Sequence, residues 1–297
     1  MKSFSKNQKI SFSGGKDFKL KNYKTNETFE FGNEDTLKAE LATYREKISS
    51  LQEKLYAQDK YSVLIVLQAI DAAGKDSCIK HVLTGVNPQG VSVSNFKAPS
   101  QVELDHDFIW RTYHQLPEKG KIGVFNRSYY EELLVCKVHP EYIVNQRIPG
   151  IDSVDDINTK FWNNRYRIIN EMERHLVKNG TIIIKIFLNL GKKEQKKRFL
   201  ERITDKSKQW KFNYADLKER AHWNDYQEAY KDMIMNTSSK YAPWHIIPAD
   251  DQWVSRALVG RLLLEHLENL NLSYPALNES DLKLLEQARK ELMNEKD

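Results

Sequence analysis

The chain has 297 residues, of which 40% are hydrophobic, 29% charged and 11% aromatic, with a formal net charge of +5. This composition is typical of a globular protein with a sizeable core, and it excludes a wholly disordered or fibrous chain. The longest continuous apolar run is Val63–Leu67, far short of the roughly 20 residues that a membrane-spanning helix needs.

The predicted elements alternate between helices and strands along most of the chain. Residues 1–32 are polar and weakly periodic, and we expect them to form an N-terminal arm that lies over the domain. Apolar residues at three- and four-residue steps predict helices, and the continuous β-branched apolar runs at 62–67 and 181–187 predict strands that are buried on both faces. The expected helices cover residues 34–56, 75–83, 102–114, 128–135, 153–177, 192–203, 214–235 and 254–267, followed by a helical tail over 276–297. The expected strands cover residues 62–67, 91–96, 122–125, 181–187 and 244–247.

This alternation predicts an α/β fold, namely a three-layer α/β/α sandwich around a parallel sheet of about five strands. The chain contains no internal repeat, low-complexity segment or Pro/Gly linker that would divide it. We therefore expect residues 33–275 to form one domain.

The positive charge is concentrated in one segment. Residues 191–211 contain nine basic and three acidic residues, so the rest of the chain is close to neutral. A concentrated basic patch on a nearly neutral body favours a polyanionic partner. A solvated helix face is the alternative interpretation.

The cysteines and the first residues indicate the compartment. Cys78 and Cys136 match no zinc or redox spacing, so we expect buried thiols in a reducing environment. The basic stretch Met1–Lys9 has no apolar segment behind it, and we expect no signal peptide and a cytoplasmic protein.

The first buried strand leads into a candidate phosphate loop. In parallel α/β sheets, ligands bind at the carboxyl ends of the strands. The small residues Ala72, Ala73 and Gly74 would let backbone N–H groups approach phosphate oxygens, and Lys75 adds a full positive charge at a helix start. The match to the Walker A motif is imperfect, and a simple helix start is the alternative. Its first glycine is replaced by Ala69, and the lysine is followed by Asp76 and then Ser77.

An aspartate inside this loop suggests a metal ion. Asp71 would repel phosphate unless a cation lay between them, and Mg²⁺ is commonly held by one or two carboxylates plus phosphate oxygens. We therefore expect Asp71 to be a Mg²⁺ ligand, with Mn²⁺ as a substitute metal. An aspartate that caps the following turn is the alternative.

A second strand end carries further polar residues. The expected strand over 122–125 is followed by Asn126, Arg127 and, one helical turn later, Glu131. Ordinary P-loop proteins place a metal-positioning Asp at this strand end, and the neutral Asn126 would shift that role to Asp71. The planar guanidinium of Arg127 could clamp phosphate at the crevice. An exposed helix surface is the alternative.

Several distinct short motifs, which include these two strand ends, are distributed along the chain. The first group comprises Asp71–Lys75, Asn87–Gly90, Phe96–Ser100, Asp105–Phe108, Trp110–Arg111 and Phe125–Glu131. The second group comprises Trp210–Phe212, Ala215–Leu217, Glu219–Arg220, Trp223, Ala242–Trp244 and Pro248–Asp250. As a set, from about residue 35 to about residue 270, these motifs resemble the type 2 polyphosphate kinase family.

The resemblance implies an enzyme that transfers a phosphoryl group between inorganic polyphosphate and a nucleotide with Mg²⁺. It also implies a P-loop kinase-like fold, similar to thymidylate kinase, with a helical lid at about 191–213. The Phe125–Glu131 motif is similar to that of the subgroup that accepts nucleoside monophosphates and, in one class, diphosphates. Ala69 and Asp76 also fit this subgroup. We therefore expect AMP and ADP to be converted to ADP and ATP.

The resemblance also implies roles for individual residues. Lys75 and the backbone of residues 72–77 would hold the transferred phosphate, while Arg127 and Arg202 would stabilise the transition state. Further substrate ligands are expected among Lys80, Lys97, Arg111, Glu131, Arg165 and Arg198. We expect a homo-oligomer whose partners are polyphosphate and nucleotides, with neither a nucleic acid nor a membrane.

Two other functions fit parts of the pattern. An ATP-dependent nucleoside monophosphate kinase would use the same phosphate loop. A nucleic-acid-binding P-loop protein would use the basic segment, but the sequence contains no RRM, KH, zinc-finger or basic-zipper pattern.

Overall fold

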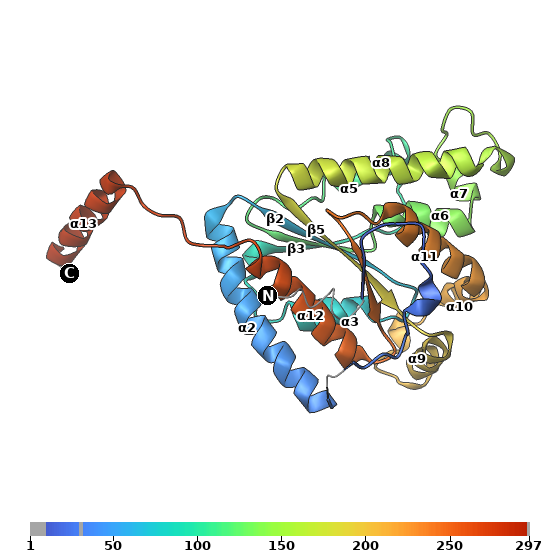
Figure 1. The fold of residues 1–297 in the computed structure, drawn as a ribbon, viewed down its shortest axis with the longest axis horizontal. Coiled ribbons are helices and arrows are strands. Elements are labelled where there is room, and N and C mark those ends of the chain that lie inside the picture. The colour runs from blue at the N-terminus through green and yellow to red at the C-terminus, as the bar shows by residue number, and fades with distance from the viewer. Residues whose placement is uncertain (1–9, 30–31, 296–297) are drawn as a thin grey trace.

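A computed structural model describes residues 10–29 and 32–295, which contain a six-stranded sheet in the order β1-β6-β5-β2-β4-β3 (Figure 1). Strands β2 to β6 run parallel to one another, which confirms the expected α/β fold with five parallel strands. Their bounds are Ser62–Gln68 for β2, Val91–Asn95 for β3, Ile122–Asn126 for β4, Thr181–Asn189 for β5 and Trp244–Pro248 for β6.

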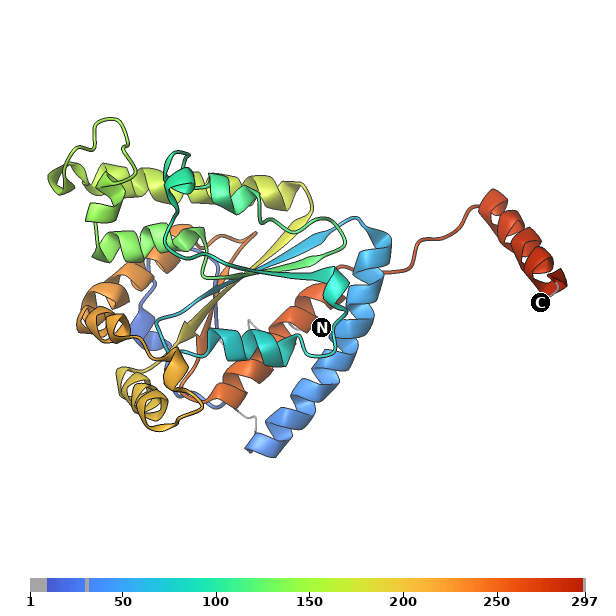
Figure 2. The ribbon, with the colours of Figure 1, turned by 180° about the vertical axis from the view of Figure 1, so that it is seen from behind.

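Helices cover both faces of the sheet (Figures 1 and 2). One face is covered by α2 (Glu34–Gln58), α3 (Lys75–Val82) and α12 (Gln252–Glu268). The other face is covered by α8 (Thr159–Lys178) and α11 (Trp223–Thr237), together with the shorter α6 (Val135–Val138) and α7 (Glu141–Val144). Helix α9 (Lys192–Thr204) and helix α10 (Tyr214–Ala221) follow β5 at the carboxyl edge of the sheet. Two 3-10 turns, η2 and η5, cover Pro88–Gly90 and Gln209–Lys211.

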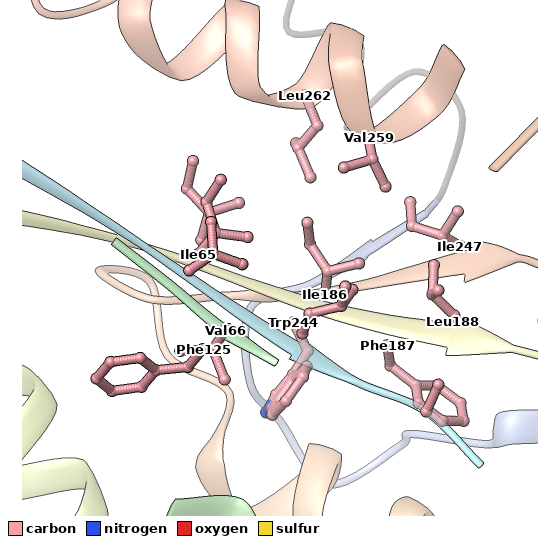
Figure 3. Packing of buried hydrophobic residues seen from close by; sticks show 14 of the residues in the cluster. Ile65, Val66, Phe125, Ile186, Phe187, Leu188, Trp244, Ile247, Val259 and Leu262 are labelled. Atoms are coloured by element: carbon pink, nitrogen blue, oxygen red, sulfur yellow. The ribbon is translucent and has the colours of Figure 1, made fainter. Parts of the chain in front are cut away.

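The core lies on both faces of the sheet, because the central strands β2 and β5 carry buried apolar side chains on both faces. Val259 and Leu262 of α12 pack over Ile186 on one face, and Phe125 and Trp244 lie on the other face (Figure 3). All five side chains are almost fully buried. This pattern agrees with continuous β-branched runs in parallel strands.

A buried ion pair joins four elements on the face of the sheet that α8 and α11 cover. The Lys185 ammonium on β5 lies 2.7 Å from the Glu173 carboxylate of α8, and neither side chain is exposed to solvent. The same ammonium donates to the Tyr130 hydroxyl at 3.1 Å and to the Thr237 carbonyl at 2.6 Å. These contacts satisfy the charged groups that the sheet buries.

Four predicted helices differ from the observed elements, and local side-chain hydrogen bonds interrupt two of them. Residues 102–114 form two short helices, α4 (Gln101–Leu104) and α5 (Trp110–Tyr113), with Asp107 accepting from the Ile109 N–H between them. The predicted helix over 128–135 is the 3-10 helix η3 (Tyr129–Leu133) followed by α6.

The other two differences lie later in the chain. At the 3-10 turn η4 (Val154–Asp156), the Asp156 carboxylate accepts from the N–H and the hydroxyl of Ser153. Helix α8 begins six residues after Ser153, because Asn158 accepts from the N–H groups of Lys160 and Phe161. The predicted helix over 214–235 is divided at His222 into α10 and α11.

The N-terminal arm adds a strand that the sequence analysis does not predict. Strand β1 (Ser11–Phe12) pairs antiparallel with β6, and the 3-10 turn η1 covers Leu20–Asn22. Ile10 and Phe18 are buried, so this part of the arm belongs to the core. The two-residue strand carries too little apolar alternation to be recognised from sequence.

The C-terminal helix α13 (Glu279–Asn294) has no buried residue and projects away from the sheet (Figure 2). Within the two described ranges, no helix combines the length and the apolarity that crossing a bilayer requires.

Candidate active site

The phosphate loop connects β2 to α3 in a strained conformation. Ala72 has a φ of +64° and Gly74 a φ of +98°, and both values lie in the left-handed region that favours glycine. The Lys75 Nζ donates to the Ala69 carbonyl at 2.8 Å, which folds the lysine back over the loop. Burial lowers the pKa of Lys75, and the Asp71 carboxylate offsets part of this shift.

Arg127 follows β4 at the same edge of the sheet. Its φ of +64° turns the chain sharply and directs the guanidinium toward the loop after β2. The Arg127 Nη2 lies 2.9 Å from the Asp71 carboxylate, and its Nη1 lies 3.8 Å from that of Glu131. Burial acts to lower the pKa of Arg127, but these two carboxylates outweigh it and raise the pKa above its ordinary value.

Arg198 of α9 holds the phosphate loop through its backbone carbonyls. Its Nη1 donates to the carbonyls of Ala72 at 3.0 Å and Ala73 at 3.1 Å, and its Nε lies 3.1 Å from the Glu194 carboxylate. Its Nη2 donates to the carbonyls of Ala249 at 2.6 Å and Asp250 at 3.0 Å. A guanidinium has five N–H donors, and here all five have protein acceptors. The geometry therefore favours a positioning role for Arg198 over the predicted contact with substrate phosphate.

Two other residues, which the sequence analysis does not single out, hold the same loop. Arg256 of α12 donates to the Ser77 hydroxyl at 2.7 Å. Gln195 of α9 donates to the Asp71 carbonyl at 2.9 Å. No local motif marks either residue, since each reaches the loop from a distant part of the chain.

Asn126 and Asp76 connect the two strand ends. The Asn126 Nδ2 donates to the Asp76 carboxylate at 2.6 Å. The Asn126 Oδ1 is buried and has no hydrogen-bond partner among the described residues. A neutral acceptor oxygen is thus left available beside the phosphate loop.

A cationic cavity of about 690 Å³ opens over the phosphate loop. Its floor consists of residues 71–77, and Asn126 and Arg127 lie at its side. The basic segment contributes Arg198, Arg202, Lys208 and Lys211, and Lys97 adds a further cation. The cavity therefore collects positive charge from several parts of the chain around a backbone N–H cradle, which suits a chain of phosphates.

A second cavity of about 600 Å³ adjoins the first and is more apolar. Its lining includes Phe96, Leu134, Tyr142, Tyr226 and Tyr230, with polar groups from Glu131 and from helix α10. The two cavities share five lining residues: Asp71, Phe96, Lys97, Ala98 and Arg127. Asp71 and Arg127 thus lie at the junction.

Glu131 lines the apolar cavity close to this junction. Burial raises the pKa of Glu131, while the cations of Arg127 and Lys75 partly offset the shift. A carboxyl group of this kind can accept a hydrogen bond or balance the neighbouring arginine.

The structure brings most of the predicted site residues together, but not all of them. Lys97 lines both cavities, and Arg111 lines the apolar one while its Nη1 donates to the Lys97 carbonyl at 2.8 Å. Lys80 is exposed on α3 and is not one of the described residues that line either cavity. Arg165 is buried, lies 3.3 Å from the Glu132 carboxylate and also pairs with Gln146. These contacts favour a structural role for Arg165 instead of the predicted contact with substrate.

Arg202 lines the cationic cavity, and its ion-pair partner Asp216 lines the apolar one. Its Nη1 is 3.3 Å from the carboxylate of Asp216 on α10, and its side chain is about one-fifth exposed. Burial raises the pKa of Asp216, as does the Asp71 carboxylate, and Arg202 opposes the shift. The ion pair connects α9 to α10 across the site.

Comparison with known proteins identifies the family. Residues 32–274 match the model of the polyphosphate kinase 2 family. An ADP-polyphosphate phosphotransferase of Rhodopseudomonas palustris is 49% identical over 253 residues, which cover 85% of this chain and 86% of the relative. An AMP/ADP-polyphosphate phosphotransferase of Meiothermus ruber is 44% identical over 260 residues, which cover 87% of this chain and 91% of the relative.

A solved structure agrees with these sequence matches. The crystal structure of polyphosphate kinase 2 from Arthrobacter aurescens TC1 superposes with a TM-score of 0.84 at 37% identity, covering 94% of this chain and 95% of that one. The chain therefore belongs to the polyphosphate kinase 2 family, as its sequence motifs imply.

Proposed function

We propose that this kinase transfers a phosphoryl group from inorganic polyphosphate to both AMP and ADP. The observation that carries the proposal is the junction of two unlike cavities at Asp71 and Arg127. The cationic cavity suits the polyphosphate donor, and the apolar cavity suits the nucleoside of the acceptor. The names of the two relatives, one for ADP and one for AMP and ADP, support the same acceptors.

The reaction needs positioning more than covalent help. A phosphate oxygen of the nucleotide attacks the terminal phosphorus of polyphosphate, and the bond to the next bridging oxygen breaks. The products are a nucleotide with one more phosphate and a chain with one fewer. Lys75, Arg127 and the loop N–H groups neutralise charge on the transferred group, and the two cavities hold donor and acceptor in line.

Magnesium fits the residues beside the loop. The described residues contain no group of three His, Cys, Asp or Glu side chains that could hold a metal. Mg²⁺ needs no such group, because one or two protein oxygens plus substrate phosphates suffice. Asp71 supplies a carboxylate, and the unpartnered Asn126 Oδ1 supplies a neutral oxygen. The ion would neutralise phosphate charge there, and Mn²⁺ would occupy the same ligands.

A magnesium titration tests this assignment. Asp71→Asn should raise the metal concentration that gives half-maximal activity and should also lower the maximal rate. Asparagine caps a turn nearly as well as aspartate, so a purely structural role predicts an unchanged half-saturating concentration. An unchanged value would exclude Asp71 as the metal ligand.

The activity itself is tested by following nucleotide products with Mg²⁺ present. AMP and ADP are incubated separately with polyphosphate or with a second nucleoside triphosphate as the donor. We expect ADP and ATP to form with polyphosphate. Turnover with the triphosphate but not with polyphosphate would identify an ATP-dependent nucleoside monophosphate kinase. Turnover with only AMP or only ADP would restrict the proposed acceptors to that nucleotide.

A further inference from the structure

A third cavity, lined largely by lysines, lies between the N-terminal arm and helix α11. It measures about 860 Å³ and shares no lining residue with the two cavities of the active site. Its charged lining consists of five lysines and one glutamate: Lys16, Lys19, Lys21, Lys24, Lys231 and Glu228. Nothing in the reaction described above uses this cavity.

Most of its positive charge is not neutralised by the protein. Glu228 is engaged by Lys231 at 2.6 Å, and Lys24 pairs with Glu27 at 3.3 Å. Lys16, Lys19 and Lys21 are exposed and have no ion-pair partner among residues 10–29 and 32–295. Like charges gathered around one cavity repel each other, so a bound anion would stabilise this arrangement.

The arm that carries these lysines is fixed to the domain. The Thr25 hydroxyl donates to the Asp250 carboxylate at 2.7 Å, and the Asp250 N–H donates to the Thr25 carbonyl at 2.9 Å. Asn189 at the end of β5 donates to the Tyr23 carbonyl at 2.8 Å. Phe18 is buried beside the Tyr23 ring. The lysines therefore extend from an ordered backbone, which lowers the entropy that binding costs.

The same anchor connects the arm to the active site. Asp250, which holds Thr25, also accepts from the Gly191 N–H at 2.7 Å at the start of α9. Its carbonyl accepts from Arg198, which supports the phosphate loop. Between Gly191 and Arg198, helix α9 carries four exposed lysines: Lys192, Lys193, Lys196 and Lys197. Both ribbon views place the arm on the side of the molecule that carries α9 and α11 (Figures 1 and 2).

We infer that the arm cavity binds a segment of the polyphosphate chain remote from the phosphoryl group that is transferred. The inference rests on the proposed function, because it assigns a second contact to the same donor. Lysine ammonium groups are point charges that suit a repeating anion. The lining offers no free aromatic platform for bases, since Phe18 is buried and Tyr23 packs against it, so a single-stranded nucleic acid fits less well.

The test removes charge from the arm and from a matched control surface. The arm variant combines Lys16→Ala, Lys19→Ala and Lys21→Ala. The control variant combines Lys60→Ala, Lys119→Ala and Lys178→Ala, which are exposed lysines before β2, β4 and β5 at the opposite edge of the sheet. Both variants lose the same formal charge, and neither touches a residue of the active site.

Steady-state kinetics with donors of different length separate the outcomes. For the arm variant, we expect the KM for long-chain polyphosphate to rise by about tenfold, which corresponds to three exposed ion pairs. Its kcat, its KM for AMP and its KM for tripolyphosphate should stay at parental values, because a short donor cannot reach the arm. The control variant should retain every parental value.

Direct binding of labelled long-chain polyphosphate gives a readout that does not depend on turnover. The slope of log affinity against log salt should become shallower by about 0.7 for each lost contact, as for single-stranded polyanions. Equal KM values for long chains in the arm and control variants would overturn the inference. Loss of oligonucleotide binding without loss of polyphosphate binding would overturn it as well. A parent enzyme that does not use polyphosphate at all would instead overturn the proposed function.

Discussion

Lys75 lies where its charge can follow the transferred phosphate. It is folded over the loop through the Ala69 carbonyl, and burial lowers its pKa while Asp71 partly restores it. Because charge stabilisation in a dry site is worth about 3–4 kcal/mol, Lys75→Ala should lower kcat by about 10²–10³ with an unchanged circular dichroism spectrum. Lys80→Ala on the same helix is the control and should stay within about twofold of the parent, as a solvated lysine does. Equal activity of the two variants would contradict the assignment.

Arg198 shows how one buried side chain can fix the loop on which catalysis depends. A lysine at this position keeps the charge but has three donors on a single nitrogen, so several loop carbonyls would lose their partner. Arg198→Lys should lower the free energy of unfolding by about 1–3 kcal/mol, the cost of leaving buried acceptors unpaired. It should lower kcat more than it raises the KM for polyphosphate. A rise in KM with an unchanged kcat would instead indicate direct contact with the donor.

At the scale of elements, helices α9 and α10 meet through the ion pair between Arg202 and Asp216. The sequence analysis predicts a transition-state role for Arg202, and its position in the lining of the cationic cavity is compatible with that role. An arginine that stabilises the transition state of phosphoryl transfer raises kcat by a factor of about 10³–10⁵. Arg202→Lys keeps the charge but loses the planar guanidinium, so it should lower kcat strongly. Lys197→Ala on the exposed face of the same helix serves as the control. Parental kcat in both variants would show that α9 presents only a solvated face.

The buried pair of Lys185 and Glu173 connects strand β5 to helix α8, with Tyr130 and Thr237 as further partners. Replacing one partner of a buried pair leaves the other charge without compensation. Lys185→Met should therefore lower the free energy of unfolding by about 3–5 kcal/mol, measured by urea denaturation. The double variant Lys185→Met/Glu173→Leu should recover part of this loss, and equal stability of the two variants would contradict the expected coupling.

At the scale of the whole molecule, the two ends of the described chain differ in how they contribute to stability. Helix α13 has no buried residue, whereas the arm contributes strand β1 and the buried side chains of Ile10 and Phe18. Removing residues 276–297 should leave the melting temperature and kcat unchanged. Removing residues 1–29 should lower the melting temperature, since two buried apolar side chains contribute about 1.5–3 kcal/mol each. Calorimetry of the two truncated proteins checks both expectations.

The sequence by itself determined the parallel sheet and the location of the phosphate loop. The buried strands are continuous β-branched runs, and a strand followed by Gly74 and Lys75 at a helix start is a local pattern. Local patterns do not reveal interruptions by caps: the helix predicted over 102–114 is two helices, and the helix predicted from residue 153 begins at Thr159, after the cap Asn158. Periodicity describes a face of a helix, whereas a cap depends on one side chain.

Only the tertiary structure decided what several of the predicted cations do. Arg198 and Ala72 are 126 positions apart in the chain, and no spacing rule connects them. Arg165 resembles a substrate ligand by type alone, but the fold buries it against Glu132. The lysines of the arm line a cavity because long-range contacts fix the arm to the domain, among them the bond from Thr25 to Asp250, 225 positions away. A guanidinium or ammonium group has the same chemistry in every context, and long-range packing alone determines whether it meets a carbonyl, a carboxylate or a substrate.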